Sequence, residues 1–79
     1  MARVDDAAGV VRGGELESLY REQGARMWRS VLAFAGDPEV ASDAVAEGFA
    51  QALRRGHKIR DPERWLWRSI FRIAAGELK

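Results

Sequence analysis

The sequence has no cysteine, so a chain of 79 residues can form neither a disulfide framework nor a cysteine-ligated metal site. Histidine occurs once, at His57, and no cluster of carboxylates or other metal ligands surrounds it at suitable spacing. Because these metal ligands are lacking, we expect no metal and no other cofactor. A chain this short buries only about 60% of the surface that its unfolded form exposes, so we expect one marginally stable domain.

Long apolar runs and a strong net charge are also missing. The longest apolar run, VLAFA at residues 31–35, is far shorter than the roughly 20 residues of a membrane span. The first 14 residues lack the basic-then-apolar layout of a signal peptide, so we expect a cytoplasmic protein without a membrane partner. Because 13 basic and 12 acidic residues give a net charge of +1, nucleic-acid binding would depend on how the charges are segregated.

Three segments have the periodicity of amphipathic helices, and none has the alternation or β-branched enrichment of a strand. The first covers residues 15–35, the second residues 38–55, and the third begins at residue 62 and runs to the end of the chain. Residues 1–14 have no sustained period and end in two glycines, which predicts a flexible leader. We predict an all-α fold, a small bundle of three main helices over residues 15–79.

The boundaries between these helices have strong local signals. Gly36 and Gly56 are suitable C-terminal stops for the first two helices. Each is followed by an Asp-Pro-Glu sequence, at residues 37–39 and 61–63, which supplies an N-cap carboxylate, a first-turn proline and a glutamate that suits the helix dipole. The connections are short, so neighbouring helices should be antiparallel.

A basic row follows one side of the third helix. Arg64, Arg68 and Arg72 recur at every fourth position, with Trp65 on the margin of the row and Ser69 as its polar neighbour. The loop before this helix adds Lys58 and Arg60. Guanidinium groups beside an aromatic ring suit a nucleic-acid backbone with an unstacked base. A tryptophan in a small bundle is more often a core residue, so the pattern leaves both interpretations open.

The second helix has an acidic counterpart, because Glu39, Asp43 and Glu47 follow one another at intervals of four. Like charges at this spacing destabilise a helix by a few tenths of a kcal/mol per pair, so we expect a compensating partner. The simplest hypothesis is that this acidic stripe pairs with the basic row of the third helix. Such surface pairs are worth only about 0 to 1 kcal/mol each. The alternative is an external partner.

No constellation in the sequence suggests catalysis. His57 lies on a glycine-flanked loop without a nucleophile or paired carboxylates near it, so it has no partner for general-base chemistry. We therefore do not expect an enzyme.

Three stretches together resemble region 2 of a bacterial sigma factor of the extracytoplasmic-function (ECF) group. ELESLYREQ at residues 15–23 is similar to the opening helix of that family, and GDPEVASDAVAEGFAQAL at 36–53 to its polymerase-binding motif. DPERWLWRSIFRIAAGELK at 61–79 is similar to its Trp-Leu and aromatic-Arg pattern. The chain departs from the family at Ala46, where glutamine is common, and at Arg72, where asparagine is common.

The resemblance implies transcription initiation without bond chemistry. It implies that the second helix binds the β′ clamp helices of core RNA polymerase, and that the loop and third helix recognise and melt the promoter −10 element. The implied polymerase-binding residues are Glu39, Asp43, Ala46 and Glu47. The implied DNA-binding residues are Lys58, Arg60, Arg64, Trp65, Arg68, Ser69 and Arg72. Further implications are an anti-sigma partner and a second, −35-reading domain, so we expect that this chain is an isolated domain or a fragment.

Two other functions are compatible with the residues. One is a helical protein-interaction module without DNA binding, in which the arginines pair internally and the second helix or exposed tryptophans bind a partner. The other is a helix-turn-helix repressor. It is disfavoured because the loop at residues 56–61 is long for that turn and the third helix is too apolar to lie in a groove.

Overall fold

The computed structural model describes the backbone of residues 3–78 and the side chains of residues 14–56 and 58–78. It has three α-helices and one 3₁₀ turn, and the described backbone contains no strand, which confirms the predicted all-α fold. The elements are α1 (Arg3–Ala35), α2 (Pro38–Arg55), η1 (Gly56–Lys58) and α3 (Pro62–Glu77).

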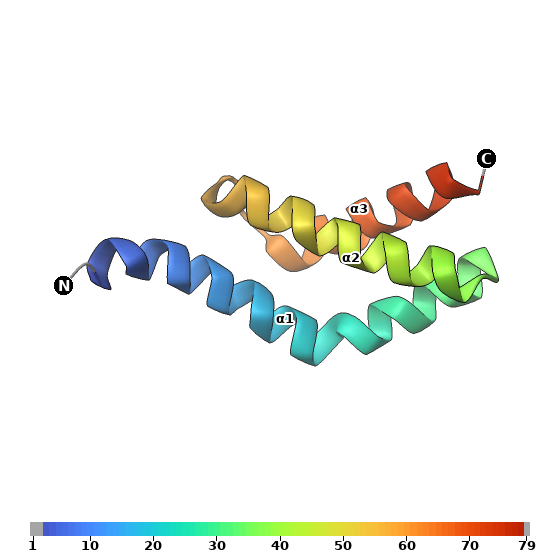
Figure 1. The fold of residues 1–79 in the computed structure, drawn as a ribbon, viewed down its shortest axis with the longest axis horizontal. Coiled ribbons are helices and arrows are strands. Elements are labelled where there is room, and N and C mark those ends of the chain that lie inside the picture. Colours follow the sequence, from blue (N-terminus) through green and yellow to red (C-terminus); the bar gives the residue numbers. More distant parts are fainter. Residues whose placement is uncertain (1–2, 79) are drawn as a thin grey trace.

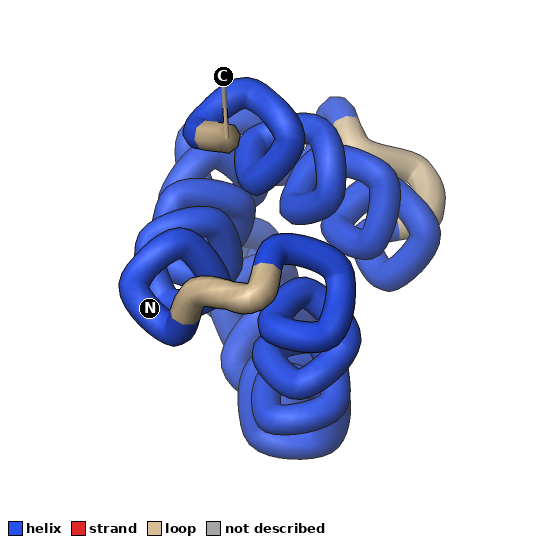
Figure 2. The backbone as a smooth tube through the Cα atoms, turned by 90° about the vertical axis from the view of Figure 1, so that its right-hand side faces the viewer, coloured by secondary structure: helices blue, strands red, loops and turns tan. Residues whose placement is uncertain are grey.

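Successive helices run in opposite directions, and each one packs against the other two (Figure 1). α1 has 33 residues and so is about 50 Å long at 1.5 Å per residue, which accounts for the longest dimension of the molecule, 47 Å. α1 curves with its concave side toward α2, as long helices do when they wrap a core. The end-on view in Figure 2 shows that short loops join the helices.

The first helix begins at Arg3 rather than at Glu15, where the sequence analysis placed its start. No proline interrupts residues 3–14, and Gly14 does not adopt the positive φ that stops a helix. Glycine in a helix costs about 1 kcal/mol relative to alanine but leaves the hydrogen-bond ladder intact, so the helix continues through it. The side chains of residues 1–13 lie outside the described part, and the flexibility predicted for this leader stays a prediction.

The predicted bounds of the second helix and the predicted start of the third are confirmed, whereas α3 ends at Glu77 and does not continue through Leu78. The carboxylate of Asp37 accepts a hydrogen bond from the Glu39 amide at 2.9 Å, and that of Asp61 accepts one from the Arg64 amide at 3.2 Å. Each first turn contains the expected proline. Gly36 and Gly56 have φ angles of 74° and 59°, a region that glycine enters without steric cost.

The core consists of the sides of the helices that face one another. Four large apolar side chains among the described residues are exposed instead: Tyr20 at 59%, Phe34 at 51%, Leu53 and Leu78. The reason is that two neighbouring helices cannot cover the whole apolar side of a third. Among the described side chains, twelve hydrophobic residues are buried: Leu16, Met27, Val31, Ala41, Ala44, Val45, Phe49, Ala52, Ile59, Leu66, Ile70 and Ala74.

α2 and α3 approach each other closely at Gly48. A Cβ atom at this position would lie 2.5 Å from Cγ1 of Ile70, a distance that real Cβ atoms essentially never show. Gly48 is buried and Ile70 is fully buried, so the Ile70 side chain occupies the space that a larger residue would need. The small residue on α2 therefore allows α3 to approach closely.

Candidate functional site

The basic row of α3 is turned to solvent. Arg64, Arg68 and Arg72 are all exposed, because four-residue spacing places them on the side of α3 away from the buried Leu66 and Ile70. Within the described part of the chain, neither the Arg64 nor the Arg68 guanidinium has a hydrogen-bond or ion-pair partner. Unpaired cations on an exposed helix side are available to an external anion.

The structure buries Ser69, one of the residues that the family resemblance assigns to DNA binding. It is 1% exposed, and its Oγ accepts a hydrogen bond from Nη2 of Arg72 at 3.3 Å. Pro62, the first residue of α3, and Ile59, in the loop before it, are also buried. In this geometry the hydroxyl of Ser69 positions Arg72 and does not itself face a ligand.

Trp65 lies between the core and the basic row. Its ring is half-buried and packs against the core cluster, as a core tryptophan does, and it keeps some exposed surface. Binding of a base by this ring stays a prediction. The guanidinium of Arg55, at the end of α2, lies over the ring, with Cζ 5.6 Å from the ring centroid. The sequence analysis did not identify Arg55, because the loop that folds α3 back along α2 creates this contact.

Two open grooves flank Trp65. We call the first the loop groove; its volume is about 270 Å³, and it is lined by Arg55, Lys58, Ile59, Arg60, Asp61, Arg64, Trp65 and Arg68. We call the second the α3 groove; its volume is about 400 Å³, and it is lined by Trp65, Arg68, Ser69 and Arg72. All seven residues predicted to bind DNA line one or both grooves. The structure therefore brings them together around one ring.

Ile59 sets the orientation of the cations in the loop. It is 5% exposed, although it lies outside any α-helix, and it joins the core cluster. Its neighbours Lys58 and Arg60 are exposed, because successive residues of the loop point in different directions once Ile59 is buried. The sequence analysis missed this role, since a single apolar residue in a loop gives no periodic signal. The side chain of His57 lies outside the described residues.

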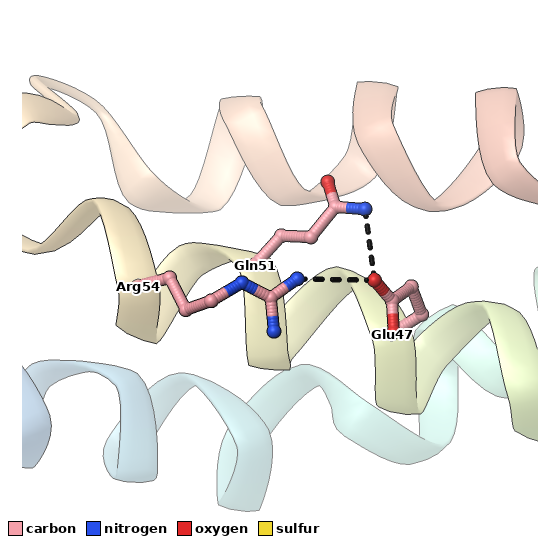
Figure 3. Close-up of polar contacts among 3 residues, drawn as sticks. All are labelled: Glu47, Gln51 and Arg54. Carbon is pink, nitrogen blue, oxygen red and sulfur yellow. Dashed lines mark hydrogen bonds and ion pairs between the residues drawn. The ribbon is translucent and has the colours of Figure 1, made fainter.

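The acidic stripe of α2 does not pair with the basic row. Glu39, Asp43 and Glu47 are exposed, and within the described side chains the ion pair of this stripe is formed inside α2, between Glu47 and Arg54. The hypothesis of ion pairs between α2 and α3 is therefore wrong for the described residues. Figure 3 shows Gln51 and Arg54 converging on one carboxylate oxygen of Glu47, at 3.0 and 3.2 Å.

The hydrogen bonds to Glu47 change the pKa of its carboxyl group. The hydrogen bond from Gln51 and that from Arg54 hold the pKa of Glu47 below its ordinary value. A lowered pKa in the folded state adds stability above the unfolded pKa, and this stability is lost as the pH falls through the folded pKa. We expect Gln51→Ala to raise the pKa of Glu47 in an NMR titration. Arg55→Gln is the control, because Arg55 makes no hydrogen bond to Glu47; an equal shift in both variants would contradict the assignment.

A third groove lies between α1 and α2, with a volume of about 860 Å³. The indole of Trp28 donates a hydrogen bond to Oγ of Ser42 at 3.0 Å and so joins the two helices inside this groove. Ala46, one of the predicted polymerase-binding residues, is exposed and lines the groove, as does Tyr20. The sequence analysis did not anticipate this groove, because it depends on how α1 and α2 pack.

Among the described residues, no group of three or more His, Cys, Asp or Glu side chains is placed to hold a metal ion. No helix in the described part combines the length and apolar character that crossing a bilayer requires. Comparison with protein-family models, curated proteins and solved structures finds no match for this chain.

Proposed function

We propose that the chain is a transcription-initiation domain, similar to region 2 of ECF sigma factors, that binds core RNA polymerase and captures the opened promoter −10 element. The observation that carries the proposal is the exposed row of Arg64, Arg68 and Arg72 along two grooves that meet at Trp65. This function would place the protein in the cytoplasm with polymerase. It requires no bond chemistry from the chain.

The geometry suits single-stranded DNA better than a duplex. A strand that leaves the stack presents phosphates to the arginines and a free base to an aromatic ring, and stacking contributes about 1 to 3 kcal/mol per base. Unstacking costs a few kcal/mol, so a domain that captures the base can favour an opened promoter without ATP hydrolysis. The loop groove, with Lys58 and Arg60 near Trp65, is the proposed place for the captured base.

The acidic stripe of α2 is the proposed polymerase-binding surface. Its carboxylates are exposed and do not neutralise the basic row, although Glu47 pairs with Arg54 of the same helix, so the two surfaces can serve separate partners. Ala46 lines the α1–α2 groove beside this stripe and gives the surface a small, neutral centre. An anti-sigma protein that covers these surfaces is a further proposed partner, because a small domain gains stability from any ligand that binds only its folded state.

Capture of bacterial core RNA polymerase by the immobilised chain tests this proposal. We expect the wild-type chain to retain polymerase, and Glu47→Lys to lower retention about tenfold or more, because a reversed charge at an interface is repelled by the groups that the carboxylate attracted. Glu22→Lys is the matched control, since Glu22 is also exposed but lies on α1. Failure of the wild-type chain to retain polymerase, or equal retention by Glu47→Lys, would count against the proposal.

The second candidate is a protein-interaction module without DNA binding. The α1–α2 groove favours it, because this groove is the largest of the three described here and has the exposed Tyr20 at its rim. Under this hypothesis, charge reversal at Asp43 or Glu47 still disrupts a protein complex, but substitutions in the basic row have no effect on any ligand. The two candidates therefore differ in the binding of a single-stranded oligonucleotide.

A further inference from the structure

Arg55 is not among the residues proposed to bind DNA, although it lines the same groove. It is the last residue of α2, it is exposed, and it lines the loop groove together with Trp65. Its guanidinium lies over the Trp65 ring rather than against a carboxylate, with Cζ 5.6 Å from the centroid. Within the described part of the chain, Arg55 has no ion-pair partner.

The Arg55 guanidinium covers the part of the Trp65 ring that lines the loop groove, the proposed place for a captured base, whereas the α3 groove reaches Trp65 without Arg55. The ring packs against the core, so at most its outward side is available for stacking. Since Arg55 is itself exposed, the part of the ring that it covers is turned to solvent. A nucleobase and the guanidinium would therefore compete for the same aromatic surface.

We infer that Arg55 is a displaceable cover of the Trp65 ring, which leaves the ring when a base stacks there and then binds a phosphate of the same strand. This inference rests on the proposed single-stranded DNA binding. It gives Arg55 two opposing roles, because the residue lowers the affinity for the base and raises the affinity for the backbone. The covered state would also keep the indole from other aromatic ligands when DNA is absent.

The two roles have different salt dependences, which makes them separable. The cation–π contact of Arg55 must be broken before a base can stack, which lowers the affinity for the base by a factor of about two to five. High salt screens the phosphate contacts but leaves this competition between Arg55 and the base in place. A phosphate contact to a single strand contributes about 0.7 to the slope of log affinity against log salt. Removing Arg55 should therefore weaken binding at low salt and strengthen it at high salt.

The first test concerns the free protein and uses the indole N–H signals of an ¹⁵N NMR spectrum. We expect Arg55→Gln to shift the indole signal of Trp65, assigned with Trp65→Phe, and to leave those of Trp28 and Trp67 in place. Arg54→Gln is the matched control, because Arg54 is adjacent, exposed and paired with Glu47. An unchanged Trp65 signal in Arg55→Gln overturns the inference without any use of DNA.

The second test is a salt series with a short single-stranded DNA oligonucleotide of mixed sequence, read by fluorescence anisotropy. In a plot of log affinity against log salt, we expect the slope for Arg55→Gln to be smaller than that of the wild-type chain by about 0.7. The two lines should cross, so that Arg55→Gln binds about two- to fivefold more tightly than the wild-type chain at the highest salt. With an abasic oligonucleotide of the same length, no base displaces Arg55, so the gain at high salt should disappear. Arg54→Gln should show no crossing with either oligonucleotide.

The outcomes separate this inference from the function on which it rests. If the wild-type chain shows no salt-dependent binding, the proposed function fails and the inference fails with it. If the wild-type chain binds but the Arg55→Gln line stays below it at every salt concentration, the inference alone is overturned. A crossing that persists with the abasic oligonucleotide also overturns it, because a base is then not the group that displaces Arg55.

Discussion

Replacing Gly48 by alanine is expected to make the protein less stable than the Gly14→Ala variant by about 1 to 3 kcal/mol, the usual cost of overpacking a core. Both substitutions replace a helical glycine, so both gain similarly in helix propensity. They differ in space, because a Cβ at Gly48 would lie 2.5 Å from Cγ1 of Ile70, whereas one at Gly14 has no atom within 4 Å. Urea unfolding followed by circular dichroism measures the difference.

The contact with Ile70 can be isolated with a second background. In Ile70→Ala the contacting Cγ1 atom is gone, so the same Gly48→Ala substitution should cost less there than in the wild-type chain. Domains of this size have only a few kcal/mol of stability, so a loss of this magnitude should leave a visible unfolded population. Equal stability of Gly48→Ala and Gly14→Ala would show that α2 and α3 are farther apart than the structure has them.

Replacing the basic row by glutamines, Arg64→Gln with Arg68→Gln and Arg72→Gln, is expected to weaken binding of a single-stranded oligonucleotide about a hundredfold at 0.1 M salt. Each phosphate contact contributes about 0.7 to the slope of log affinity against log salt. One contact therefore raises the affinity at 0.1 M salt about fivefold over its value at 1 M salt, and losing the contact removes this gain. The substitutions lie on the exposed side of α3, so the fold should be retained. Fluorescence anisotropy over a salt series gives both the loss and the slope.

The matched control for the triple variant removes the same number of charges from α1. Arg21, Arg26 and Arg29 are exposed, and none of them lines the loop groove or the α3 groove. Their replacement by glutamine should lower affinity much less, through the general field of the protein alone. Equal losses in the two triple variants would show that total charge, and not the row beside Trp65, determines binding.

The two proposed surfaces make different demands on the fold. The proposed polymerase-binding surface lies on one helix, so any sequence that forms α2 presents Glu39, Asp43 and Glu47 together. The proposed DNA-binding surface combines the end of α2, the loop and α3, and it exists only when the bundle is packed. Mild destabilisation, as in Gly48→Ala, should therefore impair oligonucleotide binding before it impairs binding at α2.

The sequence by itself determined the helices and most of their ends. Asp37 and Asp61 cap their helices, and Gly36 and Gly56 take positive φ, because these effects depend on atoms a few residues apart along the chain. The exposed row of Arg64, Arg68 and Arg72 follows from helical spacing in the same way. The start of α1 was missed because a glycine pair weakens a helix without ending it.

Only the tertiary structure decided which parts of each apolar side are covered and what Trp65 contacts. Ser69 and Ile59 are buried while Tyr20 and Phe34 are exposed, because burial depends on where neighbouring helices lie and not on the polarity of one residue. Arg55 reaches Trp65 only through the turn of the chain at residues 56–61. Local hydrogen bonds are encoded over a few residues, whereas packing and shared grooves depend on segments that meet only when the whole chain has folded.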